Sequence, residues 1–561
     1  MSAPILLLGC EPPAAVDHGP GAEAHAPSAS PSNDPAVASA EDDLSNPACD
    51  DPIDVYAGGA RIGAVCEADA KSKSLTVLDL SDGWAPRLFA PDAEGRSPAY
   101  RETLIALSDE RLGAGPEWDR PKSDRFLELY GIFPTLRVMS ARIGDDVRHR
   151  CHDEIDDQPL EKPMRDVDPW ADRDRQRAEA ARARQLERVL EAEKKKRGAG
   201  SLEELRAEPD LGGAFRELER VAVRPRAISA MQGHLRCEGL LKKGGFEGSF
   251  DHATTDALRA FQRKHMIVSY ALDEETRAVL ATDSRELDFR GLLRVLRERV
   301  IDATGLIEDG SATGAPGEVA GRVLDTRAFR FGGEPLATKG APDLVAAATD
   351  TAARSLGWTS PEAAAAFFDS LPADATRTLR VAVRLPPLPD YHGPEMDLRA
   401  EIDRGDVWYD APYTKRGGVR AQPVERRPNL VLYAKQGGAD LALVRWPTTI
   451  GGWKPERTRP KEIVLAYKMS PPGKRLWREL LAAPAWIPPE STPKRDLVRS
   501  RGDGSWTTKT DLFGPGYASA YGLTALVHHQ RPRLGAAAGD EGIRTHGSVS
   551  YSSILSGTSH G

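Results

Sequence analysis

The stretch GSFDHATTDALRAFQRKHMI, Gly248 to Ile267, decides how the middle of this chain is expected to fold. Its apolar residues Leu258, Phe261 and Ile267 have the spacing of the buried face of a helix. A glycine-rich segment precedes it, and further helical patterns lie on both sides. The stretch is therefore predicted to hold the second helix of a small bundle.

The flanking segments complete that bundle. On the N-terminal side, AISAMQGHLRCEGLL has an apolar stripe made of Ile228, Met231, Leu235 and Leu240. On the C-terminal side, ALDEETRAVL follows a short loop and has helical spacing again. Residues 226–282 are thus predicted to form three helices joined by a Gly/Asp loop and a short loop.

This segment resembles the three-helix peptidoglycan-binding domain of cell-wall enzymes. The matching parts are Met231-Gln232, the GSFDHATTDALRAFQRKH block with its Phe261-Gln262 pair, and LDEETRAVL. The loop departs from the family's usual D-G-x-F-G, because residues 247–251 read EGSFD and a Lys/Gly insertion is present. The resemblance implies binding to glycan or stem peptide of the wall. A generic three-helix bundle with the same periodicity is the alternative.

From about residue 428 the pattern is that of β-strands. NLVLYAKQGGADLALVRWPTTIGGW reads as a hairpin, two alternating runs joined by KQGGAD. WIPPE, GPGYASAYG and a strand ending in His546-Gly547 follow, and the last residues are SGTSHG with Ser559, His560 and Gly561. In this order they resemble the L,D-transpeptidase catalytic domain. Its signature is a strand ending in His-Gly, a Ser/Gly/Thr-rich loop and then Ser-His-Gly-Cys.

The resemblance implies roles for these residues. A cysteine that attacks an acyl-D-amino-acid carbonyl must be a thiolate, and His546 would take its proton. Gly547 and Gly561 would let the backbone approach the substrate. N–H groups around His560 and Gly561 would stabilise the oxyanion, and Ser559 would orient an imidazole. No cofactor or metal is needed. Ser548 or Ser559 as nucleophile is the remote alternative.

The family's cysteine belongs directly after Gly561, and the cysteines of this sequence all lie before position 238. The expectation is a catalytic domain at 428–561 that is truncated at its C-terminus. As written, the chain is expected to lack transpeptidase activity and still to bind wall polymer.

The N-terminus, MSAPILLLGC, places Leu-Leu-Gly before Cys10 and resembles a bacterial lipobox. The match is partial, because the apolar run is short and no Lys or Arg precedes it. Residues 1–10 are read as a partial lipoprotein-type signal with Cys10 as the lipidation site. Residues 11–50, rich in Pro, Ala, Ser and Gly, are predicted to be a disordered tether. This implies the periplasm or cell envelope, with a lipid anchor in a membrane.

The other cysteines are Cys49, Cys66, Cys151 and Cys237. Two disulfides could form in three connectivities. One bond among the first three is expected, and isolated thiols are the alternative. HRCH, residues 149–152, lacks a matching Cys/His pair at zinc-like spacing, so no metal site is predicted.

The fold class expected is multidomain α+β. Besides the two recognised domains it would comprise a small α/β or β-rich accessory unit at 51–160, a charged helical spacer at 161–225 with Ser201 capping a second helix, and a helical connector with strands at 283–427. In the accessory unit SLTVLDLSDGW and TLRVMSARI read as strands, and YRETLIALSDERL reads as a helix. Net charge −8 over 561 residues argues against nucleic acid as a partner.

Two functions follow. The first is a peptidoglycan L,D-transpeptidase, and the second is a noncatalytic peptidoglycan-binding lipoprotein whose C-terminal domain is only a scaffold. A peptidoglycan hydrolase is a weaker third reading, because there is neither a zinc-ligand set nor a paired carboxylate motif.

Overall fold

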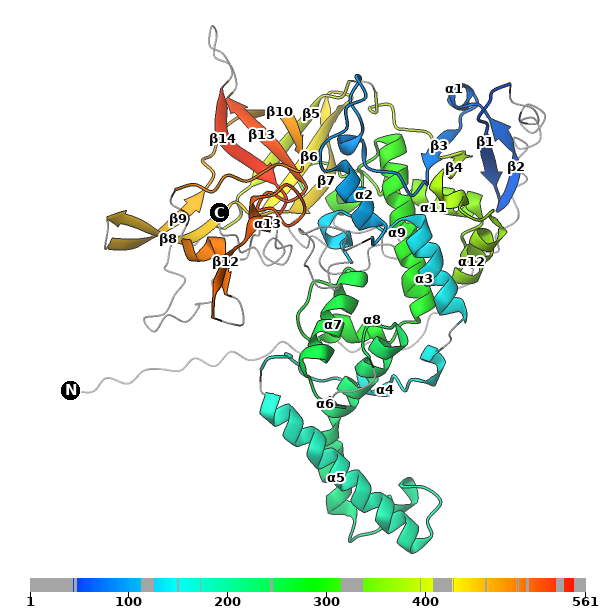
Figure 1. Ribbon diagram of the computed structural model, residues 1–561, viewed down its shortest axis with the longest axis vertical. Helices are drawn as coiled ribbons and strands as arrows, with labels where there is room; N and C mark the ends of the chain where they lie inside the picture. Colours follow the sequence, from blue (N-terminus) through cyan, green and yellow to red (C-terminus); the bar gives the residue numbers. More distant parts are fainter. Residues whose placement is uncertain are drawn as a thin grey trace.

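The computed structural model describes residues 44, 48–111, 126–148, 151–171, 173–242, 246–313, 336–393, 395–406, 426, 428–459, 462–490, 492, 494–500, 504–530 and 539–548. It mixes helices with several small sheets, as the predicted α+β class requires (Figure 1). Within these ranges, none of the helices has both the length and the apolar character needed to cross a membrane.

A four-stranded sheet carries the N-terminal part of the chain. Its strands, in the order β2-β1-β4-β3, are Ala60–Val65, Ile53–Ala57, Arg380–Val383 and Thr76–Asp79. β4 pairs in parallel with β1, through Asp54 and Val381, and antiparallel with β3. Strand β4 comes from the predicted connector, so residues 51–160 do not complete their sheet alone. Leu44, inside the predicted tether, is buried and accepts the Ala64 N–H at 3.0 Å.

One predicted strand in this region is wrong. Residues 135–143 lie in helix α3, Leu136–Arg148. Leu136, Met139 and Ile143 are fully buried in the central core. Their i, i+3, i+7 spacing is helical, and it prevails over the local alternation that suggested a strand.

The central core surrounds helix α9, Ser284–Thr304, which runs beside α3 (Figure 1). The other helices of this part are α1, Glu67–Ala70, α2, Arg101–Ser108, α11, Leu344–Leu356, and α12, Pro361–Ser370. Ser360 caps α12 by accepting the Ala363 N–H at 3.1 Å, with Pro361 in the first turn. The predicted helix in YRETLIALSDERL is confirmed by α2.

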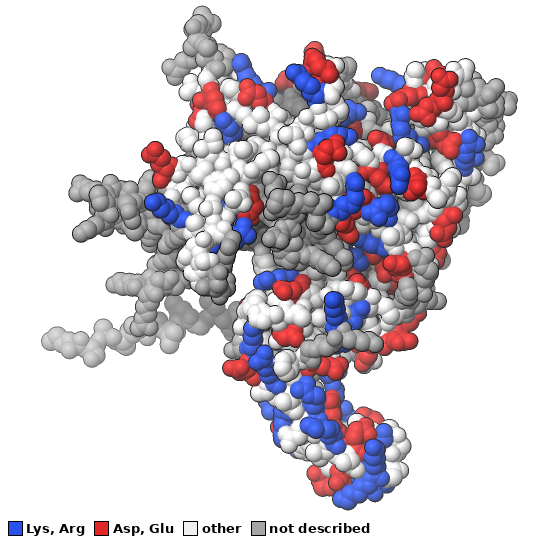
Figure 2. All heavy atoms as spheres, in the orientation of Figure 1, with Lys and Arg blue, Asp and Glu red and all other residues white. Residues whose placement is uncertain are grey.

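The predicted spacer is a helical hairpin. Helix α5, Arg173–Arg197, packs against α6, Gly212–Cys237, and their contact buries Leu186 and Leu190. The face of α5 that carries these leucines is therefore a packing face, and only the remainder is solvated. Ser201 accepts the Glu204 N–H at 3.3 Å but caps only a short 3-10 turn. Figure 2 shows acidic and basic side chains interspersed over this hairpin.

Helix α6 continues across the predicted boundary at 225/226 into the three-helix unit. There it packs with α7, His252–Lys264, and α8, Glu274–Leu280. The predicted stripe positions are buried in one core, with Leu240 at its edge: Ile228, Met231, Leu235, Leu258, Phe261 and Ile267. Helix α4, Gln158–Glu161, covers this core with Leu160, and Val167 completes it.

Two disulfides are present among the described residues. Cys49 is bonded to Cys66, a pair within the predicted set. Cys151 is bonded to Cys237, which ties the segment before α4 to the end of α6. The second bond was not predicted, because its partners are 86 positions apart in the sequence.

The C-terminal part consists of small antiparallel sheets. Their strands are β5, Leu398–Asp403, β6, Asn429–Gln436, β7, Ala439–Pro447, β8, Gly451–Arg459, β9, Glu462–Met469, β10, Arg475–Ala482, β11, Val498–Ser500, β12, Trp506–Thr508, β13, Thr524–Gln530, and β14, Asp540–His546. The predicted hairpin is β6–β7, with Gly437 and Gly438 at positive φ in its turn. β5 pairs with β6, so this sheet extends across the predicted boundary at 427/428.

A buried charge network joins the three-helix unit to the central helices. Lys264 Nζ, at the end of α7, donates to Glu238 Oε2 and to Asp288 Oδ2 of α9, each at 2.9 Å. The three side chains are 7%, 0% and 3% exposed. Although burial opposes it, the charges of Lys264 and His265 hold the pKa of Glu238 below its usual range. This network fixes one face of the unit against α9.

Asp146 of α3 makes the network sensitive to pH. Burial and the charge of Asp288 raise the pKa of Asp146 to about 8, so at neutral pH its proton is shared with Asp288. An aspartate in an unfolded chain has a pKa of about 3.9. The stability contributed by protonated Asp146 is therefore complete below about pH 4 and is lost as the pH rises through about 8.

Asp146→Asn should remove this dependence and keep a donor towards Asp288. Relative to the wild type, the variant's free energy of unfolding should rise by up to about 1.4 kcal/mol per pH unit between about pH 4 and 8. Denaturant titrations at about pH 5, 6.5 and 8 measure it. Asp145→Asn, at the exposed neighbouring position, should follow the wild type. Parallel pH profiles for Asp146→Asn and the wild type would contradict the assignment.

Candidate functional site

His546 is the last residue of β14, at one end of the sheet β10-β13-β14. It pairs in register with Ala525 of β13. The next residue, Gly547, donates its N–H to the Thr524 carbonyl at 3.2 Å, which extends the pairing by one position. The predicted arrangement of a strand that ends in His-Gly is thus what the structure has.

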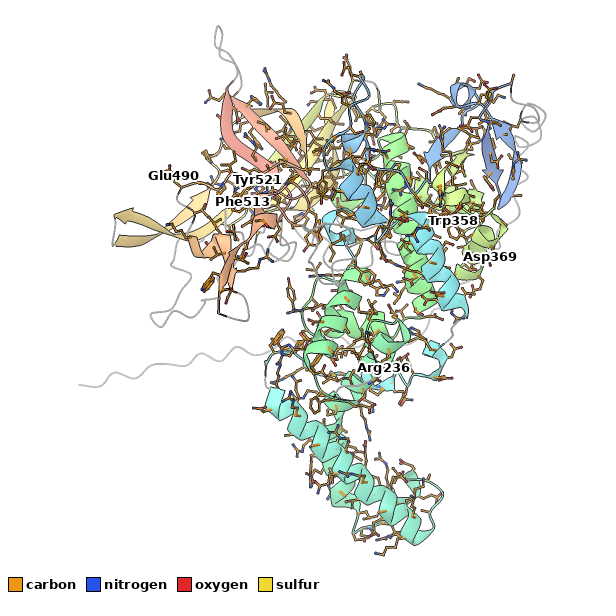
Figure 3. All side chains as sticks on the ribbon, in the orientation of Figure 1. Arg236, Trp358, Asp369, Glu490, Phe513 and Tyr521 are labelled. Carbon is orange, nitrogen blue, oxygen red and sulfur yellow. A yellow bond between two sulfur atoms is a disulfide. The ribbon has the colours of Figure 1, made fainter. Side chains whose placement is uncertain are left out.

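A second predicted segment packs against this His-Gly pair. The His546 and Tyr521 rings meet edge to face, with centroids 4.8 Å apart, and Figure 3 labels Tyr521 beside the sheet. A Cβ on Gly522 would lie 3.0 Å from the Gly547 Cα, and Gly522 has φ +65°. Only glycine permits this backbone approach. The end of GPGYASAYG and the end of β14 therefore meet in space, as two parts of one site would.

The surroundings of His546 suit a general base. Burial of its ring by neighbouring atoms lowers the pKa of His546 from its ordinary value, and the hydrogen bond to the Gly547 carbonyl opposes this only in part. The residue nevertheless stays in contact with solvent. An imidazole that is neutral near pH 7 and reachable from outside can accept a proton from a thiol or an amine.

WIPPE also packs beside this region. The Trp486 N–H donates to the Phe513 carbonyl at 2.7 Å, and the two rings stack with centroids 6.2 Å apart. Ser519, fully buried, donates to the Pro484 carbonyl at 3.3 Å. The segments that sequence order alone connected are therefore held together by hydrogen bonds.

Sequence reasoning did not single out His528 of β13. Its Nε2 accepts the Trp477 Nε1–H at 2.9 Å and lies 2.8 Å from the Thr545 hydroxyl. Burial lowers the pKa of His528. Because neighbouring residues of a strand point to opposite faces, Thr545 and His546 face opposite ways, so His528 supports the strand from behind.

The remaining predicted site residues, Ser559, His560 and Gly561, lie outside the described residues, as does Cys10. Ser548 follows Gly547 and borders the Gly522 turn. The structure thus brings His546 and Gly547 together with Tyr521 and Gly522, and it describes the base-bearing half of the predicted site.

No protein-family model, curated protein or solved structure matches this chain. The two family resemblances therefore depend on the motifs and on how the structure arranges them.

Two buried glutamines explain the motif residues of the three-helix unit. Gln232 donates to the Ser249 carbonyl at 3.3 Å and accepts the Gly248 N–H at 3.0 Å, which holds the loop before α7. Gln262 donates to the Ala271 carbonyl at 2.9 Å, which holds the loop before α8. Both are 1% exposed. Each glutamine satisfies loop backbone groups that would otherwise be buried without partners.

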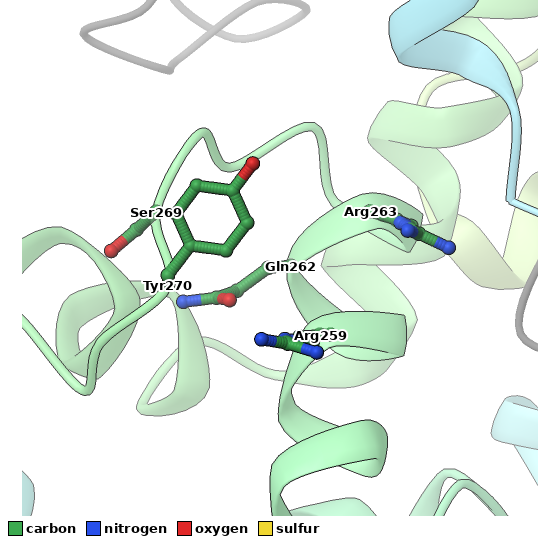
Figure 4. A pocket seen from close by; sticks show the side chains of 5 residues that line it. All are labelled: Arg259, Gln262, Arg263, Ser269 and Tyr270. Atoms are coloured by element: carbon green, nitrogen blue, oxygen red, sulfur yellow. The ribbon is translucent and has the colours of Figure 1, made fainter. Parts of the chain in front are cut away.

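A pocket of about 190 Å³ opens beside the second of these loops (Figure 4). It is lined by Arg259, Gln262, Arg263, Ser269 and Tyr270. In Figure 4, Arg259 and Gln262 lie on the same side as the Tyr270 ring, and Arg263 extends away from them. Sequence reasoning named Gln262 only as a motif residue and missed the others, although an arginine at each end of one helical turn was a readable signal.

For metals, the described residues contain no group of three or more His, Cys, Asp or Glu side chains that could hold an ion. Of HRCH, Cys151 is in a disulfide and His152 Nδ1 lies 3.0 Å from His234 Nδ1.

Proposed function

We propose that this chain is an L,D-transpeptidase of the cell wall, an acyltransferase that acts on peptidoglycan stem peptides without cofactor or metal. The observation that carries the proposal is the contact of Tyr521-Gly522 with His546-Gly547. Two motif segments of the resemblance meet there at a neutral, solvent-accessible imidazole. Such an enzyme would work in the periplasm or cell envelope, anchored to a membrane through Cys10.

In the proposed reaction a cysteine sulfur attacks the stem-peptide carbonyl and forms a thioester as the bond to the terminal D-amino acid breaks. His546 takes the thiol proton, which goes to the leaving amine. An acceptor amine of another stem or of an anchored protein then displaces the sulfur, and His546 receives its proton.

The test starts from the reading frame beyond Gly561, where the proposal requires a cysteine codon next. The protein expressed from that frame should be acylated by a carbapenem, seen as a mass increase of one inhibitor per chain. Another residue at that position, or no acylation, would make the transpeptidase proposal wrong.

A noncatalytic wall-binding protein is the second candidate, and the pocket beside α7 favours it, because binding there needs no nucleophile. Deleting residues 226–282 is a poor test, since Cys237 and Lys264 tie this unit to the rest. Tyr270→Ala, at a side chain 52% exposed, should instead reduce retention on purified sacculi several-fold. Val189→Ala on α5, at 48% exposure, should not. Unchanged retention of both would count against this candidate.

A further inference from the structure

We infer that the pocket beside α7 binds the carboxyl-terminal residue of a peptide, with Arg259 holding its carboxylate and Gln262 accepting its amide N–H. Naming that peptide as a wall stem peptide rests on the proposed function. The inference itself rests on two polar groups in the pocket.

Gln262 provides an acceptor with no partner. Its amide nitrogen is identified by its donation to the Ala271 carbonyl at 2.9 Å, because a carbonyl can only accept. The same nitrogen donates to Thr276 Oγ1 at 3.0 Å, so the amide is held in one orientation. Its Oε1 is buried without a hydrogen-bond partner. An unpaired buried acceptor is costly, and a ligand N–H would satisfy it.

Arg259 provides the complementary donor. Among the described residues no carboxylate pairs with it, and its Nε is buried without a partner. Its guanidinium carbon lies 5.5 Å from the Trp170 ring centroid and 6.0 Å from that of Tyr270. A guanidinium held between two rings without a counter-ion is prepared for an incoming carboxylate, which it binds with two parallel N–H groups.

Trp170 positions Arg259 and does not serve as a platform for sugar. Arg173 lies over the same ring at 4.1 Å, and His252 meets it edge to face at 5.5 Å. With its surroundings taken by these side chains, the indole orients the guanidinium. Trp170 lies before residue 226, so the site extends beyond the segment that carries the family resemblance.

The size of the pocket selects the ligand. At about 190 Å³ it is close to the roughly 150 Å³ cavity that holds benzene. It is smaller than the roughly 300–1,000 Å³ of pockets for larger ligands. One amino-acid residue fits, whereas a disaccharide does not. An α-carboxylate next to a peptide N–H is the small group that satisfies Arg259 and Gln262 together.

Calorimetry on the full chain tests this with three synthetic tetrapeptides of stem sequence. One ends in D-alanine with a free carboxylate, one is its carboxamide, and one has its last peptide nitrogen methylated. The free acid should bind roughly tenfold or more tightly than either analogue, because each analogue removes one of the two interactions. Arg259→Gln should abolish the preference for acid over amide, and Trp170→Leu should weaken it. Arg220→Gln, at an exposed arginine on α6, should keep it.

Equal binding of acid and amide by the wild type would overturn the inference, as would an undiminished preference in Arg259→Gln. The analogues test the site even if a variant fails to fold, which a thermal melt detects. Sacculus retention separates the two proposals. Retention without a preference for the acid would defeat only the inference, whereas an Arg259-dependent preference without retention would defeat only the wall function.

Discussion

Lys264→Ala should lower the free energy of unfolding by about 3–5 kcal/mol, because it leaves two buried carboxylates without their common partner. Glu238 and Asp288 have exposed fractions of 0% and 3%, so water cannot replace the ammonium group without opening the contact between α7 and α9. The loss should exceed that of any exposed lysine. Denaturant titration with a check for two-state behaviour measures it.

Lys242→Ala is the matched control, since this lysine is exposed near the end of the same α6–α7 connection, and its effect should stay within about 0.5 kcal/mol. A compensated variant, Lys264→Met with Glu238→Gln and Asp288→Asn, should recover much of the stability, because no unpaired charge remains. A loss below about 1 kcal/mol for Lys264→Ala would mean that the network is hydrated and does not join the two parts.

His546→Gln should slow carbapenem acylation of the protein read through beyond Gly561 by roughly 10²–10⁴-fold, the range expected when a general base is removed. Glutamine is close in size and can still accept a hydrogen bond, so the Tyr521 contact and the glycine approach should survive. Stopped-flow mass spectrometry follows the acylated fraction with time, and the unfolding midpoint of the variant confirms its fold.

His529→Gln is the control, because this imidazole lies on the neighbouring strand, 3.5 Å from Glu479. It should leave the acylation rate unchanged. Since burial lowers the pKa of His546, the imidazole loses activity through protonation only below the ordinary value near 6.5. The rate attributable to His546 should therefore hold from pH 7 down to about that pH. A similar rate for His546→Gln and the wild type would remove this residue from the mechanism.

Local patterns predicted local structure well. The stripe from Ile228 to Leu235, the hairpin turn at Gly437-Gly438 and the Ser360-Pro361 start of α12 all depend on residues within a few positions of one another. The failure at 135–143 is of the same kind. A nine-residue window there satisfies both periods in part, and only the packing of Leu136 and Met139 on α9 selects the helix.

Distant pairings could not be predicted in this way. Nothing near Arg380–Val383 indicates that this strand inserts between β1 and β3, and nothing near Cys237 points to Cys151. Parallel pairing through two ladder positions leaves no local signature, so the boundaries drawn from composition extend across shared sheets and a shared helix.

For the site, sequence order found His546, Gly547 and the Tyr521-Gly522 segment, because backbone proximity requires glycine at both places. The pocket residues Arg259, Tyr270 and Trp170 were beyond its reach. Their importance comes from a missing partner, which is a property of three-dimensional neighbours and not of spacing.

The order of strands in the first sheet has a consequence for biosynthesis. β1 leaves the ribosome roughly 330 residues before β4, which at about 5–20 residues per second is a wait on the order of 20 s to a minute. Until then β1 and β2 are an isolated two-stranded hairpin, which is marginal in water. The Cys49–Cys66 bond closes the chain around that hairpin. Early oxidation would keep the nascent ribbon in register, with its open edge ready to receive the late strand.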